Sequence, residues 1–166
     1  MIRRAAMLAA VLLLSACGLR PLYGGGAGGA VATRLSAVTV GPIAGQSGWL
    51  IRNKLVDRLG AAGTSEPAYR LDVVVDDNIT SFGLRRDQAA TQERRTLRAR
   101  YQLVDLRNGT VLLDATAGSD SAIDIVSSEY ATVAAEQTAL EQLSDTVAEQ
   151  IMARLALYAS RTAAPK

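Results

Sequence analysis

The dipeptide Asn108-Gly109 joins two runs in which apolar and polar residues alternate. Residues 96–106 alternate before it, and residues 110–117 alternate after it. A period of two is typical of a strand with one buried face, and an Asn-Gly pair between two such runs is among the strongest short-range signals for a β-hairpin. The chain is therefore expected to fold around an antiparallel hairpin. Its predicted inward side chains are Leu97, Ala99, Tyr101, Leu103, Val111, Leu113, Ala115 and Ala117.

Two further strands are predicted before this hairpin. Residues 69–76 also alternate, and residues 35–40 form a short run with β-branched residues that Gly41-Pro42 ends. The sheet face opposite the apolar one is then polar and charged, as expected for a face that is left uncovered. The residues predicted on that face are Arg70, Asp72, Asp76, Arg98, Arg100, Leu112 and Asp114.

Two helices complete the predicted fold. Ser47 is a candidate N-cap for a helix over residues 48–59, which Gly60 and Gly63 end. From Ser127 or Ser128 onward the chain lacks Gly and Pro until Pro165, and apolar residues recur every three or four positions. This spacing predicts a helix of about 30 residues that packs one apolar stripe against the sheet. The stripe consists of Leu140, Leu143, Val147, Ile151, Leu155 and Tyr158.

The element order is therefore β-α-β-β-β-α. It predicts an α/β protein of the α+β type, a two-layer sandwich in which two helices pack on a small mixed four-stranded sheet. The predicted domain covers residues 34–161, with a tail at residues 162–166.

The N-terminus has the layout of a secretory signal. Arg3 and Arg4 precede an uncharged run over residues 5–14, which is shorter than the roughly 20 residues that span a bilayer as a helix. The following Leu14-Ser15-Ala16-Cys17 resembles the bacterial lipobox, in which the Cys thiol receives a diacylglyceryl group and the signal is cut before it. We therefore expect residues 1–16 to be removed, Cys17 to carry the lipid, and residues 17–33 to form a Gly-rich tether. An ordinary signal peptide with an incidental Cys is the alternative.

Charge and residue usage exclude several functions. Removal of Arg3 and Arg4 leaves 16 of the 18 Lys and Arg, which equals the 16 Asp and Glu. The chain without its predicted signal is therefore formally neutral. The chain has no His, and its one Cys is the predicted lipid site, so the usual proton shuttle and thiol nucleophile are missing. The acidic pair in Asp76-Asp77-Asn78 is more typical of a solvated turn than of a cation site. The sequence predicts no enzyme, no metal and no cofactor other than the lipid.

A local cluster of arginines interrupts the neutral pattern. Six arginines stand against Asp87 and Glu93 between residues 85 and 100. Guanidinium groups bind phosphate in a bidentate manner, so the cluster could hold an anionic ligand; a charged, solvated hairpin is an equal alternative. Nucleic acid is disfavoured, because no aromatic residues interleave with the cluster. The six are Arg85, Arg86, Arg94, Arg95, Arg98 and Arg100.

Three segments resemble a known family. The mature start Cys17-Gly18-Leu19-Arg20-Pro21-Leu22-Tyr23-Gly24, the stretch Ser128-Glu129-Tyr130-Ala131 with Ala134-Ala135-Glu136, and the ending at residues 151–158 are similar to the lipopolysaccharide-assembly lipoproteins of the LptE family, in particular its alphaproteobacterial branch. The resemblance implies two helices on a small sheet and a lipoprotein on the periplasmic side of the outer membrane, anchored by N-acyl and S-diacylglycerol chains on Cys17.

The same resemblance implies two partners. A protein of this family plugs the LptD β-barrel, assists its assembly and binds lipopolysaccharide during transport to the cell surface. By analogy, the six arginines are candidate lipopolysaccharide contacts. An auxiliary lipoprotein of an envelope ABC-type lipid transport system is the alternative function.

Overall fold

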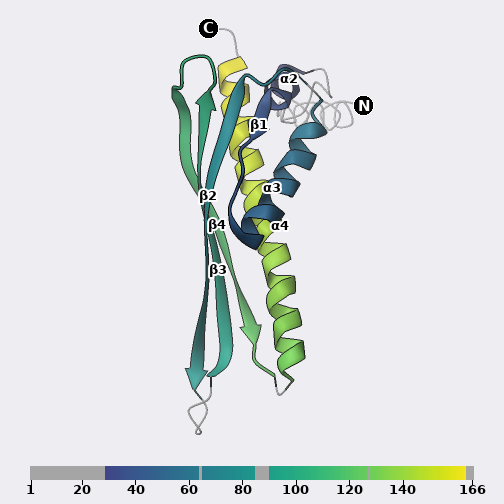
Figure 1. Ribbon diagram of the computed structural model, residues 1–166, viewed down its shortest axis with the longest axis vertical. Coiled ribbons are helices and arrows are strands. Elements are labelled where there is room, and N and C mark those ends of the chain that lie inside the picture. The colour runs from purple at the N-terminus through teal and green to yellow at the C-terminus, as the bar shows by residue number, and fades with distance from the viewer. Residues whose placement is uncertain (1–28, 64, 85–89, 127, 164–166) are drawn as a thin grey trace, which may run out of the picture.

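The computed structural model describes residues 29–63, 65–84, 90–126 and 128–163. They form two layers, a long twisted sheet and a layer of helices on one of its faces (Figure 1). The predicted signal peptide at residues 1–16, the predicted lipid site Cys17, and Arg85 and Arg86 lie outside the described residues. The elements are α2 (Ala30–Ser36), β1 (Val38–Val40), α3 (Gly45–Gly60), β2 (Tyr69–Leu84), β3 (Ala90–Asp105), β4 (Val111–Asp124) and α4 (Glu129–Ala163). The predicted order β-α-β-β-β-α and the α+β class are confirmed, with α2 as an additional helix.

The sheet order is β1-β2-β3-β4. β1 runs parallel to β2, and the other neighbours are antiparallel, so the sheet is mixed. The β3–β4 hairpin forms where the Asn-Gly pair predicts it, and Gly109 adopts a φ of 71° in the turn. One inward residue was predicted wrongly. Val111 is exposed because a register shift next to Val104 turns it away from the core. By the same shift Leu112, which was predicted on the charged face, packs against the core.

β2, β3 and β4 are longer than predicted. β2 continues from Asp76 to Leu84, β3 begins at Ala90, and β4 continues to Asp124. These extensions are rich in charged residues and Ser, which have low β-propensity. They form because polar side chains pair across strands, as in the hydrogen bonds of Ser81 with Glu93 and Gln92 with Asp124.

The N-terminal part of the domain differs from the prediction. Residues 30–36 form α2, so the predicted strand over residues 35–40 is reduced to β1, and the helix takes up the last residues of the predicted tether. Leu35 is buried on α2, where helical geometry points it into the core. Ser47 is not an N-cap either, because α3 begins at Gly45 after an Ala44 cap that makes no side-chain hydrogen bond.

The two long helices run parallel to each other on the same face of the sheet (Figure 1). Three polar contacts join residues of α3 to residues of α4 that lie 91 positions later in the chain: Gln46 to Gln137, Lys54 to Asp145 and Arg58 to Glu149. This constant offset fixes the parallel register of the pair. None of the helices in the described part of the chain has the length and hydrophobicity needed to span a bilayer.

The core lies between the helices and the inward face of the sheet. The predicted stripe of α4 is part of it: Leu140, Leu143, Val147, Ile151 and Leu155 are buried, and Tyr158 is half-buried. The prediction that this stripe packs in the core rather than on a partner is confirmed. Leu97 and Tyr101 of β3 meet it from the sheet.

We predict that Leu97→Ala will lower the free energy of unfolding by roughly 2–5 kcal/mol, because the removed side chain leaves a cavity in a fully buried site. Val74→Ala is the matched control on the opposite face, where the side chain is 74% exposed, and should change stability by about 0.5 kcal/mol or less. Chemical denaturation of both variants measures the difference. Equal losses would contradict the assignment of Leu97 to the core and Val74 to the solvent-facing side.

Candidate functional site

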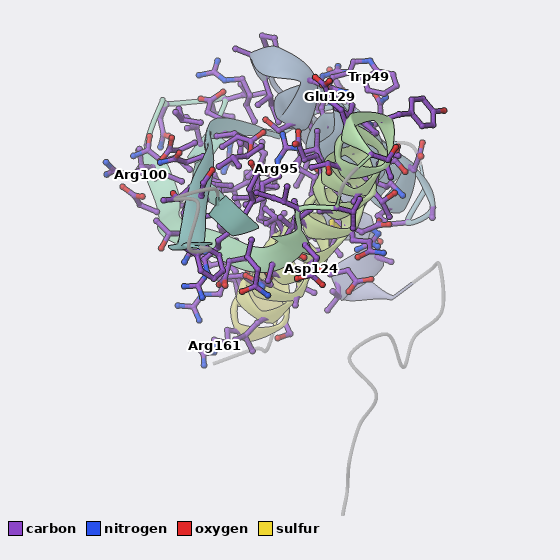
Figure 2. The ribbon with its side chains drawn as sticks, turned by 90° about the horizontal axis from the view of Figure 1, so that it is seen from below. Trp49, Arg95, Arg100, Asp124, Glu129 and Arg161 are labelled. Carbon is purple, nitrogen blue, oxygen red and sulfur yellow. The ribbon has the colours of Figure 1, made fainter. Side chains whose placement is uncertain are left out.

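The arginine cluster is divided between the two faces of the sheet. Even-numbered residues of β2 and β3, and of β4 from Asp114 onward, point away from the helices, onto what we call the outer face, and odd-numbered residues point toward the helices. Figure 2 shows Arg100 projecting outward from the sheet, whereas Arg95 lies between the strands and α4. The described arginines of the cluster therefore do not converge on one site, although they are close in sequence.

Arg95 holds the sheet to the long helix. Its guanidinium donates to both carboxylate oxygens of Asp77 on β2, at 2.9 and 2.8 Å, and to the backbone carbonyl of Glu136 on α4, at 3.0 Å. The side chains are only 13% (Arg95) and 21% (Asp77) exposed. A bidentate, largely buried pair of this kind fixes geometry, so Arg95 is a structural residue rather than a free binding group.

The charges of the outer face are largely paired with each other. Arg100 donates to the two carboxylate oxygens of Asp114 at 3.2 and 2.8 Å, and Gln102 donates to the same carboxylate at 2.8 Å. The hydrogen bond from Arg100, followed by that from Gln102, lowers the pKa of Asp114 to about 2. At the other end of the face, Arg70 donates to both oxygens of Asp72.

The remaining two arginines on this face are less constrained. The guanidinium of Arg94 lies 5.4 Å from the centre of the Phe82 ring and 3.9 Å from Asp120, a loose ion pair. Arg98 forms no ion pair with any residue that the structure describes. Its side chain crosses directly over Gly118 of β4, where the Cβ of any larger residue would come within 2.5 Å of the Arg98 Cδ atom. Because Gly118 has no side chain, the side chain of Arg98 has room to cross β4 at this position.

Arg98 borders an open hollow at the β4 edge, with a volume of about 470 Å³. Thr116, Ser119, Asp120 and Gln150 also line it, so hydroxyl and amide groups and one carboxylate surround the guanidinium. The hollow is within the volume range of ligand sites but is polar rather than apolar. It is the part of the cluster best suited to an anionic group.

Acids from the neighbouring strands offset the local positive charge read from the sequence. Asp72, Asp76, Asp114 and Asp120 share the outer face with the arginines, and Asp77 faces inward. Asp76 and Asp77 thus point to opposite faces, and no group of acids in the described residues is arranged to hold a metal ion. The sequence missed this balance because the pairing acids lie 14 to 26 positions away from their arginines.

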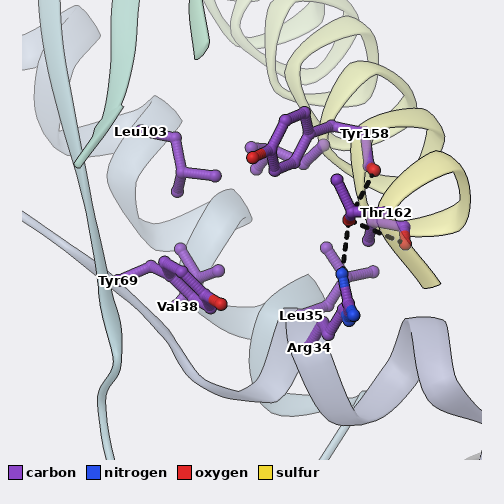
Figure 3. Close-up of a pocket in the computed structure, with 9 residues that line it drawn as sticks. Arg34, Leu35, Val38, Tyr69, Leu103, Tyr158 and Thr162 are labelled. Atoms are coloured by element: carbon purple, nitrogen blue, oxygen red, sulfur yellow. Dashed lines mark hydrogen bonds between the residues drawn. The ribbon is translucent and has the colours of Figure 1, made fainter. Parts of the chain in front are cut away.

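A small apolar pocket lies at the end of the domain where α2 meets the last turns of α4 (Figure 3). Leu35, Leu103, Leu155 and Tyr158 line it, and Arg34 donates a hydrogen bond to Thr162 at its rim. Its volume of about 60 Å³ is well below the several hundred cubic ångströms typical of ligand pockets. It is a packing defect near the chain ends rather than a ligand site.

Solved structures share this two-layer α+β architecture. A lipoprotein from Caulobacter crescentus is 25% identical with a TM-score of 0.67, and the match covers 82% of this chain and 100% of that one. Rare lipoprotein B from Shewanella oneidensis has the same fold at 10% identity and a TM-score of 0.59, over 75% of this chain and 97% of that one. Lipoprotein B from Nitrosomonas europaea has it at 13% identity and a TM-score of 0.57, over 74% and 82%. The fold is thus one that bacterial lipoproteins use.

The sequence model of the LptE family, described as lipopolysaccharide-assembly, matches residues 35–155. The chain therefore belongs to the LptE family, as residues 17–24 and the segments at residues 128–136 and 151–158 predicted. No curated protein sequence matches the chain. The family match covers all the strands from β1 to β4 and most of α4.

We predict that the carboxyl group of Asp114 will titrate at about pH 2 in the folded chain, below its ordinary pKa of 3.8. The Arg100–Asp114 contact then contributes stability above about pH 3.8, and this contribution is lost as the pH falls through 2. Arg100→Gln should move the pKa back toward the ordinary value, and Gln102→Ala should move it less. NMR titration of the carboxyl carbon measures both; a native midpoint near 3.8 would contradict the pairing of Asp114 with Arg100.

Proposed function

We propose that this chain is an outer-membrane lipoprotein that plugs the LptD β-barrel, assists its assembly and binds lipopolysaccharide on its way to the cell surface. The observation that carries the proposal is the LptE family match over residues 35–155. In this proposal Cys17 carries the N-acyl and S-diacylglycerol chains, and residues 17–28 connect the anchor to the domain. The domain acts by binding and not by catalysis.

The outer face of the sheet suits a plug. The lumen of a membrane barrel is polar, so a domain inside it needs a polar surface. The outer face supplies charges that are already paired, as in Arg100 with Asp114 and Arg70 with Asp72. A face with internal pairs loses less hydration energy on contact with another polar wall than a face of unpaired charges would.

Arg98 is the group that we propose for lipopolysaccharide. Lipopolysaccharide carries phosphate groups, and a guanidinium without an ion pair among the described residues can donate two hydrogen bonds to one of them. Arg94 stands on the same face four residues away, about 13 Å along the strand, and is held by only one loose ion pair. Arg95 and Arg100 are assigned no contact, because Asp77 and Asp114 already occupy them.

Isolation of the full-length lipoprotein from membranes in mild detergent tests the plug. We expect a β-barrel of the outer membrane to co-purify in equal amount and to resist washing with high salt, because a plug is held by a large enclosed surface rather than by a few screened charges. Recovery with an ATPase complex of the inner membrane, and without the barrel, would instead support an auxiliary lipoprotein of an ABC-type transport system.

Replacement of single arginines tests the ligand role. Arg98→Ala should weaken retention of purified lipopolysaccharide by roughly tenfold, the effect of losing charge-assisted hydrogen bonds. Arg100→Ala is the matched control, two positions away on the same face but paired with Asp114, and should change retention little. Equal effects of the two variants, or no effect of either, would contradict the ligand role of Arg98 and support a solvated, charged face. Circular dichroism establishes that both variants are folded.

A further inference from the structure

Most of the free edge of β2 has no neighbouring strand in the described part of the chain. β1 pairs with Tyr69, Arg70 and Leu71 only, whereas β2 continues to Leu84. Figure 1 shows the long lower part of β2 running beyond β1 and α3 along the side of the molecule. The edge over residues 75–81 is therefore open over about 20 Å.

The backbone groups on this edge point outward from the sheet. The backbone N–H of Gly41 donates to the carbonyl of Leu71 at 3.0 Å, and the backbone N–H of Leu106 donates to the carbonyl of Ala68 at 3.0 Å. Odd-numbered residues of β2 thus direct their N–H and C=O groups toward the β1 side, and even-numbered residues bond β3. Val75, Asp77, Ile79 and Ser81 continue this row, and none of their backbone groups bonds a described residue outside the β2–β3 ladder.

The opposite edge of the sheet, on β4, differs because a side chain of α4 bonds its backbone. On β4 the side-chain amide of Gln150 accepts a hydrogen bond from the backbone N–H of Gly118 at 3.0 Å and donates to its carbonyl at 3.3 Å. α4 thus bonds the β4 edge at one position, Gly118. Residues 72–82 contain no Lys, Pro or Gly, so the β2 edge is protected only in part, by the acids Asp72 and Asp76 and by the inward-facing Asp77.

The helix layer next to this edge is incomplete. The 16 residues of α3 span about 24 Å, and the 35 residues of α4 span about 53 Å, close to the length of the 16-residue β2. α4 packs on β3 and β4, and α3 contacts β2 only near its start. The inward side of β2 beyond Val75 is therefore covered only in part: Arg95 holds the carboxylate of Asp77, whereas Ile79 is 39% exposed.

We propose that residues 75–81 of β2 form a docking edge for an extended segment of a partner protein, which adds a strand antiparallel or parallel to β2. A row of backbone donors and acceptors recognises another extended main chain and gives a lipid no matching partner. The inserted strand carries apolar side chains on its inward side, next to Val75 and Ile79. On its outward side it carries a basic residue near Asp76, which forms no ion pair among the described residues.

This proposal goes beyond the proposed function and does not depend on it. The docking edge requires a partner with an extended segment, whether that partner is the outer-membrane barrel or another envelope protein. If the barrel does not co-purify but a strand still occupies the edge, the proposed function fails and the docking edge stands.

Photo-crosslinking in cells that produce the full-length lipoprotein tests the docking edge. A benzophenone amino acid replaces Asn78, which is exposed on the outer face beside the edge, and in a second strain it replaces Thr116 on the β4 side of the same face. We expect position 78 to form an adduct that mass spectrometry maps to an extended segment of another protein, and position 116 not to reach that segment.

Proline substitution separates backbone pairing from simple proximity. Ile79→Pro removes an outward N–H that is not used by β3, and edge strands tolerate Pro at such positions. It should reduce the adduct from position 78 about fivefold or more, the effect of one lost backbone hydrogen bond. Ile79→Ala keeps the N–H and should retain most of the adduct. Asp76→Asn, which leaves the backbone intact, should reduce the adduct about twofold to fivefold through the lost charge.

Four results would overturn the docking edge. They are the absence of an adduct with another protein, an adduct with a second copy of this chain, an adduct with residues 17–28 of the same chain, and an adduct that Ile79→Pro and Asp76→Asn both leave unchanged. Thermal unfolding of the two variants shows whether each is still folded. If Ile79→Pro unfolds the domain, the adduct yield of Asp76→Asn alone tests the docking edge.

Discussion

The β2–β3 ladder is the constraint on which the rest of the structure depends, because it fixes the direction of every side chain along two 16-residue strands. Odd-numbered residues face the helices, so Leu71, Leu97 and Tyr101 are buried, and even-numbered residues face away. A shift of one residue would exchange the two sets and bury Arg98 and Arg100. The same parity directs the odd backbone groups of β2 outward. One pairing register therefore determines the core, the charged face and the free edge together.

The electrostatics follow from that register. In sequence the arginines of β3 form a positive cluster, but the register brings acids of β2 and β4 beside them, and the face becomes a network of paired charges. Such pairs at the surface contribute little to stability, since salt and water screen them. Arg95 is the exception, because it is largely buried and bonds both Asp77 and the backbone of α4. The described part of the cluster thus consists of one structural residue, Arg95, and three surface residues. Arg100 is paired with Asp114, Arg94 has one loose ion pair, and Arg98 has no ion pair among the described residues.

The sequence predicted the parts of the fold that depend on local periodicity. The Asn-Gly hairpin, the alternation of β2 and β3 and the buried stripe of α4 need only near neighbours to be recognised. The sequence did not predict the ends of the strands or helix α2. Polar residues such as Asp77 and Ser81 lie in the extension of β2, where Arg95 and Glu93 pair with them across the ladder. The inward direction of Arg95 could have been predicted, since it shares the parity of Leu97; the pairing of Arg100 could not, because it depends on the register of β4.

The two edges of the sheet differ in how far the helices cover them, because α3 and α4 differ in length. α4 is as long as the strands, so it can cover β3 and β4 along their whole length and supply Gln150 to the β4 edge. α3 has 16 residues and covers about half that length, so the end of β2 extends past its cover. Gly118 takes part on both sides of this edge. Its backbone bonds Gln150 of α4, and its missing side chain leaves room for Arg98 on the outer face. The fold thus bonds the β4 edge at Gly118 from its own described residues, whereas β2 beyond Leu71, with its exposed Ile79, has no neighbouring strand on that side in the described part of the chain.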